Sequence, residues 1–284
     1  MNESSPPLRP LRPVLLLDRF APLQAELIAL LRGLAPGDWQ RPTACALWSV
    51  KDIVAHLLDD DLRRLSSDRD GVPPAEDGPG DYASLVAWIN RMNAQWVAAA
   101  RRLSPRVLVD LLELTGPQVV ELFRSRDPFA PAHWAVAWAG ETESQHWFDV
   151  GRDYTERWLH QQQIREAVGA PRLTGAEWLG PVLELFVRAV PVALRGVVRA
   201  PGTAVHLAVA GEAGGDWTVR RGEAGWELFA GAASAAAASV RLSDDTAWRL
   251  FSKGLPPDAA RERCRIEGDQ ILGTAVLGAL AIMA

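Results

Sequence analysis

Three residues of this sequence, Glu156, His160 and His56, have side chains that could together hold a metal ion. Glu156 and His160 are four positions apart, so on a helix their side chains share one face. His56 lies about a hundred residues earlier in the chain. Two imidazoles and one carboxylate are a common ligand set for catalytic zinc, and they leave one coordination position open for water or substrate. The Glu-x3-His spacing alone carries little information, because charged helices contain it by chance.

The segment around His56 has a well-marked helix start. Ser49 is typical of an N-cap residue, and Asp52, three positions on, completes a capping-box-like pair. Trp48 and Ile53 are placed for a hydrophobic staple across this start. His56 follows about two turns into the helix, beside apolar positions that should face a core. Taken alone, the residue fits a buried structural histidine better than a ligand, because a ligand needs convergent partners.

Two longer segments change this interpretation. Residues 48–57 (WSVKDIVAHL) resemble the second-helix signature of the DinB-like metal-binding bundles, and specifically of the mycothiol-dependent maleylpyruvate isomerase family. Residues 157–169 (RWLHQQQIREAVG) resemble the fourth-helix signature of that family. Other DinB-like proteins usually carry His-x3-His there, whereas the isomerase branch carries Glu-x3-His, as this chain does. The resemblance covers nearly the whole chain, although the C-terminal third matches only in outline. It implies that His56, Glu156 and His160 are the metal ligands.

The resemblance also implies a chemistry. The expected cofactors are one divalent metal ion, zinc or alternatively nickel, and a low-molecular-weight thiol such as mycothiol. A bound ion lowers the pKa of a coordinated thiol or water. In the family, the thiolate adds to a cis-ene dicarbonyl acid, rotation becomes easy, and elimination returns the trans product. Arginines would be needed to bind the substrate carboxylates, and Arg220, Arg221 and Arg249 are candidates.

Several residues near the motifs have alternative interpretations. Asp60, one turn beyond His56, fits either a partner or extra ligand of the metal or a solvated position in the acidic run 59–61. Gln163 and Asp153 flank the same stripe as the Glu-x3-His pair, so they could donate or accept hydrogen bonds there.

The remaining histidines and the cysteines are not expected at the site. His146 is 14 residues from His160, or about 21 Å along one helix, which no single ion bridges. His133, His146 and His206 are therefore expected to be structural or surface residues. Cys45 and Cys264 match no metal or disulfide spacing and neither is placed near the motifs, so a protein thiol nucleophile is not expected.

The periodicity of apolar residues and the positions of Gly and Pro predict two domains. Helices are expected near 15–34, 49–68, 82–103, 106–125, 141–168, 174–198, 244–253, 257–263 and from 269 onward. Strands are expected at 204–210, 216–221, 225–229, 239–242 and 264–267. The alanine-rich residues 232–238 are expected to form an exposed connection.

The expected fold is mainly α with an α+β C-terminal domain. Residues 1–13 are rich in Pro and Ser and are expected to be flexible. Residues 14–172 are expected to form a DinB-like four-helix bundle that brings the ligands together. Residues 173–284 are expected to form a small sterol-carrier-like α/β module, because 244–250 (DDTAWRL) and 268–269 resemble that module.

The composition excludes several classes of protein. The 284 residues carry a formal charge of −5 with a pI near 5.6, which argues against broad nucleic-acid binding. No run approaches the roughly 18 apolar residues of a membrane-spanning helix. The apolar residues 14–17 are too few for a signal peptide. Two cysteines in a chain of this length are typical of a reducing cytoplasm, so we expect a cytoplasmic protein. We expect it to be a monomer or a homodimer.

Two classes of function remain open from the sequence. The first is a metal- and thiol-dependent isomerase or transferase acting on a small electrophilic acid. The second is a non-catalytic protein of the DinB-like superfamily that binds a metal or an apolar ligand. The three-residue ligand set favours the first, since a purely structural zinc usually has four protein ligands.

Overall fold

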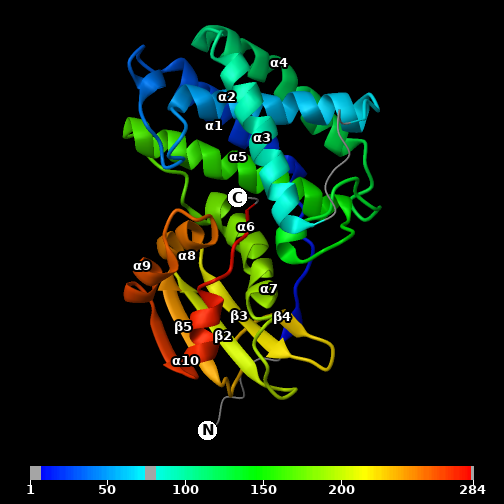
Figure 1. Ribbon diagram of the computed structural model, residues 1–284, viewed down its shortest axis with the longest axis vertical. Helices are drawn as coiled ribbons and strands as arrows, with labels where there is room; N and C mark the ends of the chain where they lie inside the picture. Colours follow the sequence, from blue (N-terminus) through cyan, green and yellow to red (C-terminus); the bar gives the residue numbers. More distant parts are fainter. Residues whose placement is uncertain (1–7, 74–80, 283–284) are drawn as a thin grey trace. The chain divides into compact units, whose positions relative to one another are not determined.

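The computed structural model of the protein describes residues 8–73 and 81–282, which divide into two compact units (Figure 1). The helical unit comprises Leu15–Ala135 and Glu143–Arg172. The sheet unit comprises Val136–Thr142, Leu173–Ile282 and the N-terminal residues up to Val14. Each unit has its own buried apolar core, and each is described separately below.

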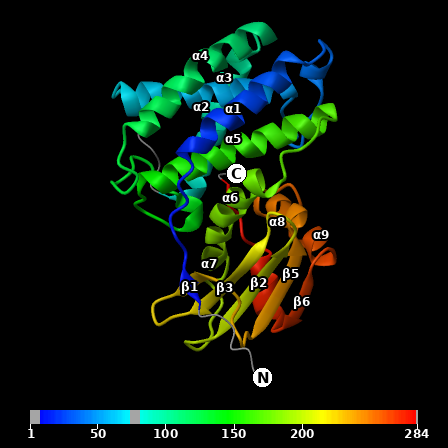
Figure 2. The ribbon, with the colours of Figure 1, turned by 180° about the vertical axis from the view of Figure 1, so that it is seen from behind.

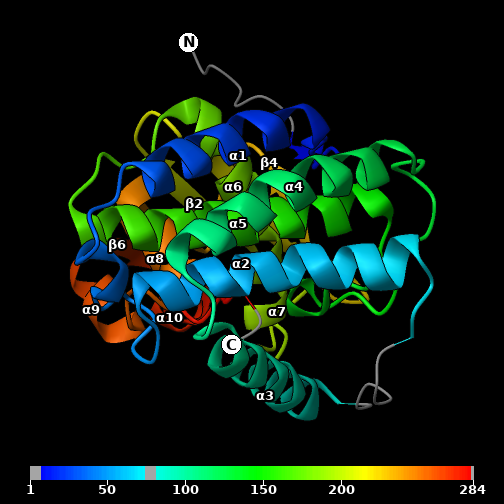
Figure 3. The same cartoon turned by 90° about the horizontal axis from the view of Figure 1, so that it is seen from above.

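The helical unit is a bundle of long helices. Its elements are α1 (Leu17–Arg32), η1 (Asp38–Gln40), α2 (Val50–Arg64), the π-helical turn η2 (Leu65–Arg69), α3 (Tyr82–Ala100), α4 (Pro105–Arg124) and α5 (His146–Val168). The helix α1 packs against α4 and α5, and α2 packs against α3, α4 and α5 (Figure 3). The helix α4 packs against both α1 and α2, whereas α3 packs mainly on α2.

The difference between α3 and α4 follows from their apolar residues. The buried positions of α3 are Trp88, Asn93, Val97 and Ala100. The helix α4 instead carries a stripe of buried residues along its whole length, from Leu108 to Phe123. The longer apolar stripe of α4 can be buried fully only against two neighbouring helices, whereas the few buried residues of α3 need one neighbour.

The helix α2 begins as the sequence predicts. The Ser49 hydroxyl accepts a hydrogen bond from the Asp52 amide, and the Asp52 carboxylate accepts one from the Ser49 amide at 3.1 Å, so the capping box is confirmed. Val50, Ile53 and Leu57 are buried on the face that carries the core. This face also includes His56.

The helix α5 differs from its neighbours because most of its buried residues are polar. It begins at His146, five residues later than the expected start at 141, because residues 143–145 are irregular. Trp134 and Trp138 precede this helix, and Trp138 lies in the short turn η3 of the other unit. The buried polar residues of α5 are Asp149, Asp153, Thr155, Arg157, His160, Gln161, Gln162, Gln163 and Arg165. A helix of this kind needs internal partners for each polar group, and these partners determine how α5 packs against α2.

The sheet unit is a six-stranded mixed sheet with helices packed on it (Figure 2). Its strands are β1 (Arg9–Pro10), β2 (Ala204–Ala210), β3 (Gly215–Arg221), β4 (Trp226–Ala230), β5 (Ala238–Ser243) and β6 (Arg265–Gly268). Its helices are η3 (Ala137–Ala139), α6 (Ala176–Phe186), η4 (Val187–Ala189), α7 (Val190–Ala193), α8 (Asp244–Phe251), α9 (Pro257–Glu262) and α10 (Gln270–Val276). The order is β1-β4-β3-β2-β5-β6, and only β2 and β5 are parallel. The strands β2 to β6 confirm the expected positions to within one residue at each end.

Two parts of the sheet unit differ from expectation. Arg9 and Pro10 pair with Ala230 and Phe229 as the edge strand β1, so the expected flexible segment does not extend over these residues. The single helix expected at 174–198 is instead α6, η4 and the short α7. Pro191 explains this break, because it has no amide proton to donate to the Val187 carbonyl and its ring crowds that carbonyl, so the chain forms the 3-10 turn η4 there.

The alanine-rich connection from β4 to β5 passes over strands of the sheet. The Ala233 amide donates to the Thr218 hydroxyl on β3 at 3.0 Å, and the Ala237 amide donates to the Ala204 carbonyl on β2 at 2.8 Å. Residues 234–237 are exposed, as the sequence predicts, while 232 and 233 are half-buried. Within the described residues, no helix is long and apolar enough to span a bilayer.

Candidate metal centre

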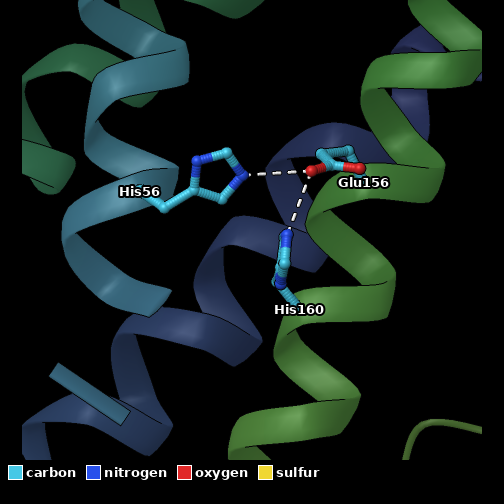
Figure 4. A group of neighbouring side chains, drawn as sticks. All are labelled: His56, Glu156 and His160. Atoms are coloured by element: carbon cyan, nitrogen blue, oxygen red, sulfur yellow. Dashed lines mark hydrogen bonds and ion pairs between the residues drawn. The ribbon is translucent and has the colours of Figure 1, made fainter. Parts of the chain in front are cut away.

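The helices α2 and α5 bring the three predicted ligands together. The Nε2 atoms of His56 and His160 lie 3.1 Å and 3.0 Å from Oε1 of Glu156. One donor atom from each of the three residues lies within 4.8 Å of the other two. Figure 4 shows both imidazoles directed at the same carboxylate, with Glu156 and His160 on one helix and His56 on the facing helix.

These distances fit a single small cation. Nitrogen and oxygen ligands lie about 2.1 Å from zinc, so neighbouring ligands at a tetrahedral angle are roughly 3.4 Å apart. The 3.0 and 3.1 Å separations need only a slight opening to admit such an ion. The side chains of His56 and His160 are 4% and 8% exposed, whereas Glu156 is 36% exposed. An ion would therefore reach the site from the side of the carboxylate.

The tautomer of His160 is fixed by Gln163. The Nδ1 atom of His160 lies 2.8 Å from Oε1 of Gln163, an oxygen that can only accept. Nδ1 therefore donates, and Nε2 is the nitrogen that faces the centre, as a metal ligand requires. The expectation that Gln163 hydrogen-bonds near the site is confirmed.

Cys45 also lies at this site, contrary to the sequence-based expectation. Its thiol donates to the same Gln163 oxygen at 3.2 Å. The thiol is brought there by the loop before α2, which folds back onto the last turns of α5. No spacing rule relates Cys45 to a residue 118 positions away, so the sequence held no signal for this contact. Because the thiol is on the Nδ1 side of His160, it supports the orientation of a ligand.

Trp48 forms a wall beside both imidazoles. Its ring centroid lies 4.9 Å from that of His56 and 6.1 Å from that of His160. The Nδ1 atom of His56 is buried and has no hydrogen-bond partner among the described residues. The orientation of His56 is therefore set by ring packing, whereas that of His160 is set by a hydrogen bond.

The three side chains strongly influence one another's protonation. Burial alone lowers the pKa of His160, but the adjacent Glu156 carboxylate outweighs burial and raises this pKa well above its ordinary value. Burial alone raises the pKa of Glu156, but His160 and His56 together lower it well below its usual range. In the metal-free protein the centre thus holds a proton on imidazole beside an ionised carboxylate. A divalent cation would replace that proton.

A buried network of ion pairs joins α2 to α5 next to the centre. Arg64 on α2 binds both oxygens of Asp149 at 2.7 and 2.8 Å and also contacts Asp153 at 3.2 Å. Arg157 on α5 binds Asp61 on α2 and Asp153 on its own helix, each at 2.6 Å. Asp153 is therefore part of this network and not a partner of the ligands. Because the pairs cross between the helices in both directions, they hold α2 and α5 in the register that places His56 opposite Glu156.

The other candidate residues lie elsewhere. His206 pairs with Asp216 in the sheet unit at 2.6 Å, and the ring of His133 packs on Trp134. His146 is the first residue of α5 and lies almost four helical turns before His160. The three candidate arginines are in the sheet unit, where Arg220 stacks on Phe229, Arg221 contacts the Gly222 carbonyl and Arg249 pairs with Asp245. Their role in binding a substrate stays a prediction.

Comparisons with known proteins identify a family and a similar fold. The family model described as "Mycothiol maleylpyruvate isomerase N-terminal domain" matches residues 20–165, which include all three donor residues. The fold is similar to a crystal structure of the mycothiol-dependent maleylpyruvate isomerase, with a TM-score of 0.51, 12% identity, and coverage of 82% of this chain and 86% of that chain. A crystal structure of a point mutant of that enzyme is similar at a TM-score of 0.50 and 11% identity, with the same coverage. No curated protein sequence matches this chain.

Proposed function

Because this chain belongs to the family of the mycothiol maleylpyruvate isomerase N-terminal domain, we propose that it is a metal- and thiol-dependent enzyme acting on a small electrophilic acid. The reaction is a cis–trans isomerisation or the transfer of a thiol to its substrate. The observation that carries this proposal is the convergence of two Nε2 atoms and one carboxylate oxygen at 3.0–3.1 Å, with the imidazoles buried and the Glu156 side chain partly exposed. Three protein ligands leave a coordination position for a thiol.

In this proposal, His56, Glu156 and His160 hold the ion, and the donor set suits zinc, with nickel as an alternative. When bound, the ion lowers the pKa of a coordinated thiol into the neutral range. Glu156 supplies the negative charge that offsets part of the cation's charge. Gln163 keeps the proton of His160 on Nδ1 and so leaves Nε2 free to bind. Trp48 shields one side of the centre from water.

The test is thiol-dependent turnover by the metal-loaded protein. Wild type and Glu156→Gln are loaded with zinc, their metal content is determined by elemental analysis, and maleylpyruvate is supplied with mycothiol. We expect thiol-dependent turnover by wild type, and a lower metal content and a lower rate in Glu156→Gln, because the variant keeps the side-chain shape and helix propensity but loses the charge. A wild-type protein that binds metal but shows no turnover with any thiol would leave the metal centre standing and would reject the enzyme in favour of a binding protein.

A further inference from the structure

The ligand pair on α5 has a counterpart on α2. Glu156 and His160 are a carboxylate and an imidazole four residues apart on α5, and His56 and Asp60 are an imidazole and a carboxylate four residues apart on α2. Each helix therefore presents one imidazole and one carboxylate on adjacent turns of the facing surface. The sequence left Asp60 open between a solvated position and a partner of the metal.

The position of the Asp60 carboxylate favours a partner of the metal. Its Oδ2 atom lies 3.6 Å from Nε2 of His56, close to the separation of roughly 3.4 Å between two ligands of one zinc ion. Its Oδ1 atom accepts from Arg63 at 2.6 Å, so the carboxylate is held by one oxygen and turns the other toward His56. The Asp60 side chain as a whole is 17% exposed, so it is largely shielded from water. Asp60 is not among the three donors whose atoms lie within 4.8 Å of one another, so its side chain would have to rotate to bring Oδ2 to the ion.

We infer that Asp60 is a fourth, exchangeable protein ligand of the ion, which occupies the coordination position until a thiol displaces it. This inference rests on the proposed metal centre and adds a residue to it. The bond from Arg63 to Oδ1 would keep the displaced carboxylate beside the centre, so the exchange needs no movement of α2. Zinc tolerates a change from four to five ligands, which gives the incoming ligand a path.

Asp59 provides a matched control. It is the preceding residue on α2, it is also paired with Arg63, at 3.2 Å, and its side chain is 10% exposed. Substituting Asn at either position removes one negative charge from the same turn of the same helix. Of these two aspartates, only Asp60 pairs with Nε2 of His56.

The experiment compares full-length wild type, Asp60→Asn, Asp59→Asn and His160→Ala. Zinc affinity is measured by competition with a chromophoric chelator, and the visible absorption of the cobalt-substituted proteins reports the ligand set. Melting of the metal-free proteins verifies that each is folded. We expect Asp60→Asn to weaken zinc binding by about tenfold or more and to alter the cobalt spectrum, while Asp59→Asn leaves both near wild type.

Two results would overturn the inference. One is an unchanged cobalt spectrum in Asp60→Asn. The other is an equal loss of zinc affinity in Asp59→Asn and Asp60→Asn, which would mean that charge alone is responsible. The His160→Ala protein separates this inference from the proposed function: if only His160→Ala loses metal, the centre stands and Asp60 is not a ligand.

Discussion

The two histidines of the centre are held by different means, and this difference can be tested. Gln163 fixes His160 through a 2.8 Å hydrogen bond, and Cys45 donates to the same amide oxygen. Gln163→Met keeps the length of the side chain but removes the acceptor for Nδ1. We expect zinc affinity to fall by about 10- to 100-fold, as for other residues that orient a metal-bound imidazole. Chelator competition measures this change.

The control for this prediction is Cys45→Ala, which removes the thiol and leaves the Gln163 amide in place. Its zinc affinity should stay close to that of wild type. If both variants bind zinc as wild type does, the orientation of His160 does not depend on this hydrogen bond.

The pKa shifts predict how metal binding depends on pH. Glu156 raises the pKa of His160 well above its ordinary value, so in the metal-free protein His160 stays protonated to higher pH than a free imidazole. The ion must displace this proton, so affinity rises with pH until the pH exceeds the raised pKa. We therefore expect the apparent zinc affinity to keep rising above pH of about 6.5, where an unperturbed imidazole would level off.

A series of zinc titrations across this range, in a buffer that does not bind zinc, measures the effect. Flat affinity from about pH 7.5 down to about 5 would contradict a centre with two imidazoles. A plateau beginning at about 6.5 would instead show that Glu156 does not raise the pKa of His160.

At the scale of residues, the sequence predicts positions along a helix better than contacts between loops and helices. The capping box at Ser49 marks where α2 begins, and the Glu-x3-His pair is held together by the geometry of α5 itself. The approach of Cys45 to Gln163 depends on how the loop before α2 folds over α5, which no local pattern encodes. Trp48 shows the same limit: the sequence places it for a staple, and the structure places its ring beside both imidazoles.

At the scale of elements, the register of α2 against α5 decides whether the ligands converge. Arg157 is buried and binds Asp61 and Asp153, so replacing it removes the cation paired with Asp61 and leaves Asp153 with Arg64 alone. Removing one partner of a buried ion pair typically costs about 3–5 kcal/mol. We expect Arg157→Met to lower the free energy of unfolding by about this amount, measured by denaturant titration of the metal-free protein.

Arg124 is the matched control for Arg157. It lies on α4, its side chain is 58% exposed, and it pairs with Glu121 three residues earlier. Exposed pairs of this kind contribute less than about 1 kcal/mol, so Arg124→Met should unfold almost as wild type does. A similar small change in Arg157→Met would mean that the network does not hold α2 against α5.

The elements themselves were largely predictable because their apolar periodicity and boundary residues agree. The strands β2 to β6 lie between turn residues, and they match the expected ranges to within one residue at each end. Which helices neighbour one another was harder to predict, because α3 and α4 both read as amphipathic and only the extent of the apolar stripe separates them. The break between α6 and α7 has a local cause at Pro191, which the long apolar run 174–198 concealed.

At the scale of the whole molecule, the chain passes between its units more than once. The N-terminal residues belong to the sheet unit, the helical unit follows from Leu15, and Val136–Thr142 returns to the sheet unit before α5. Only from Leu173 does the chain stay in the sheet unit to the last described residue. The sequence suggested a simple succession of domains, because a two-residue strand such as β1 is too short for any periodic pattern.

The role of β1 can be tested without disturbing the metal centre. Deleting residues 1–10 removes the strand that pairs with β4 and leaves β4 as an exposed edge. About two backbone hydrogen bonds are lost, which corresponds to roughly 1–3 kcal/mol. We expect faster amide hydrogen exchange in Trp226–Ala230, measured by mass spectrometry, and unchanged exchange in α2 and α5. Zinc affinity should also be unchanged, because all three donors lie between residues 15 and 172.

Deleting only residues 1–7 is the control, since this variant keeps Arg9 and Pro10. Its exchange in β4 should match wild type, because the partner strand is still present and β4 keeps its hydrogen bonds on both sides. If the longer deletion exchanges no faster than the shorter one, β1 does not protect the sheet edge. If the longer deletion weakens zinc binding, the N-terminal strand influences the helical unit, and the two units do not behave as separate folding units.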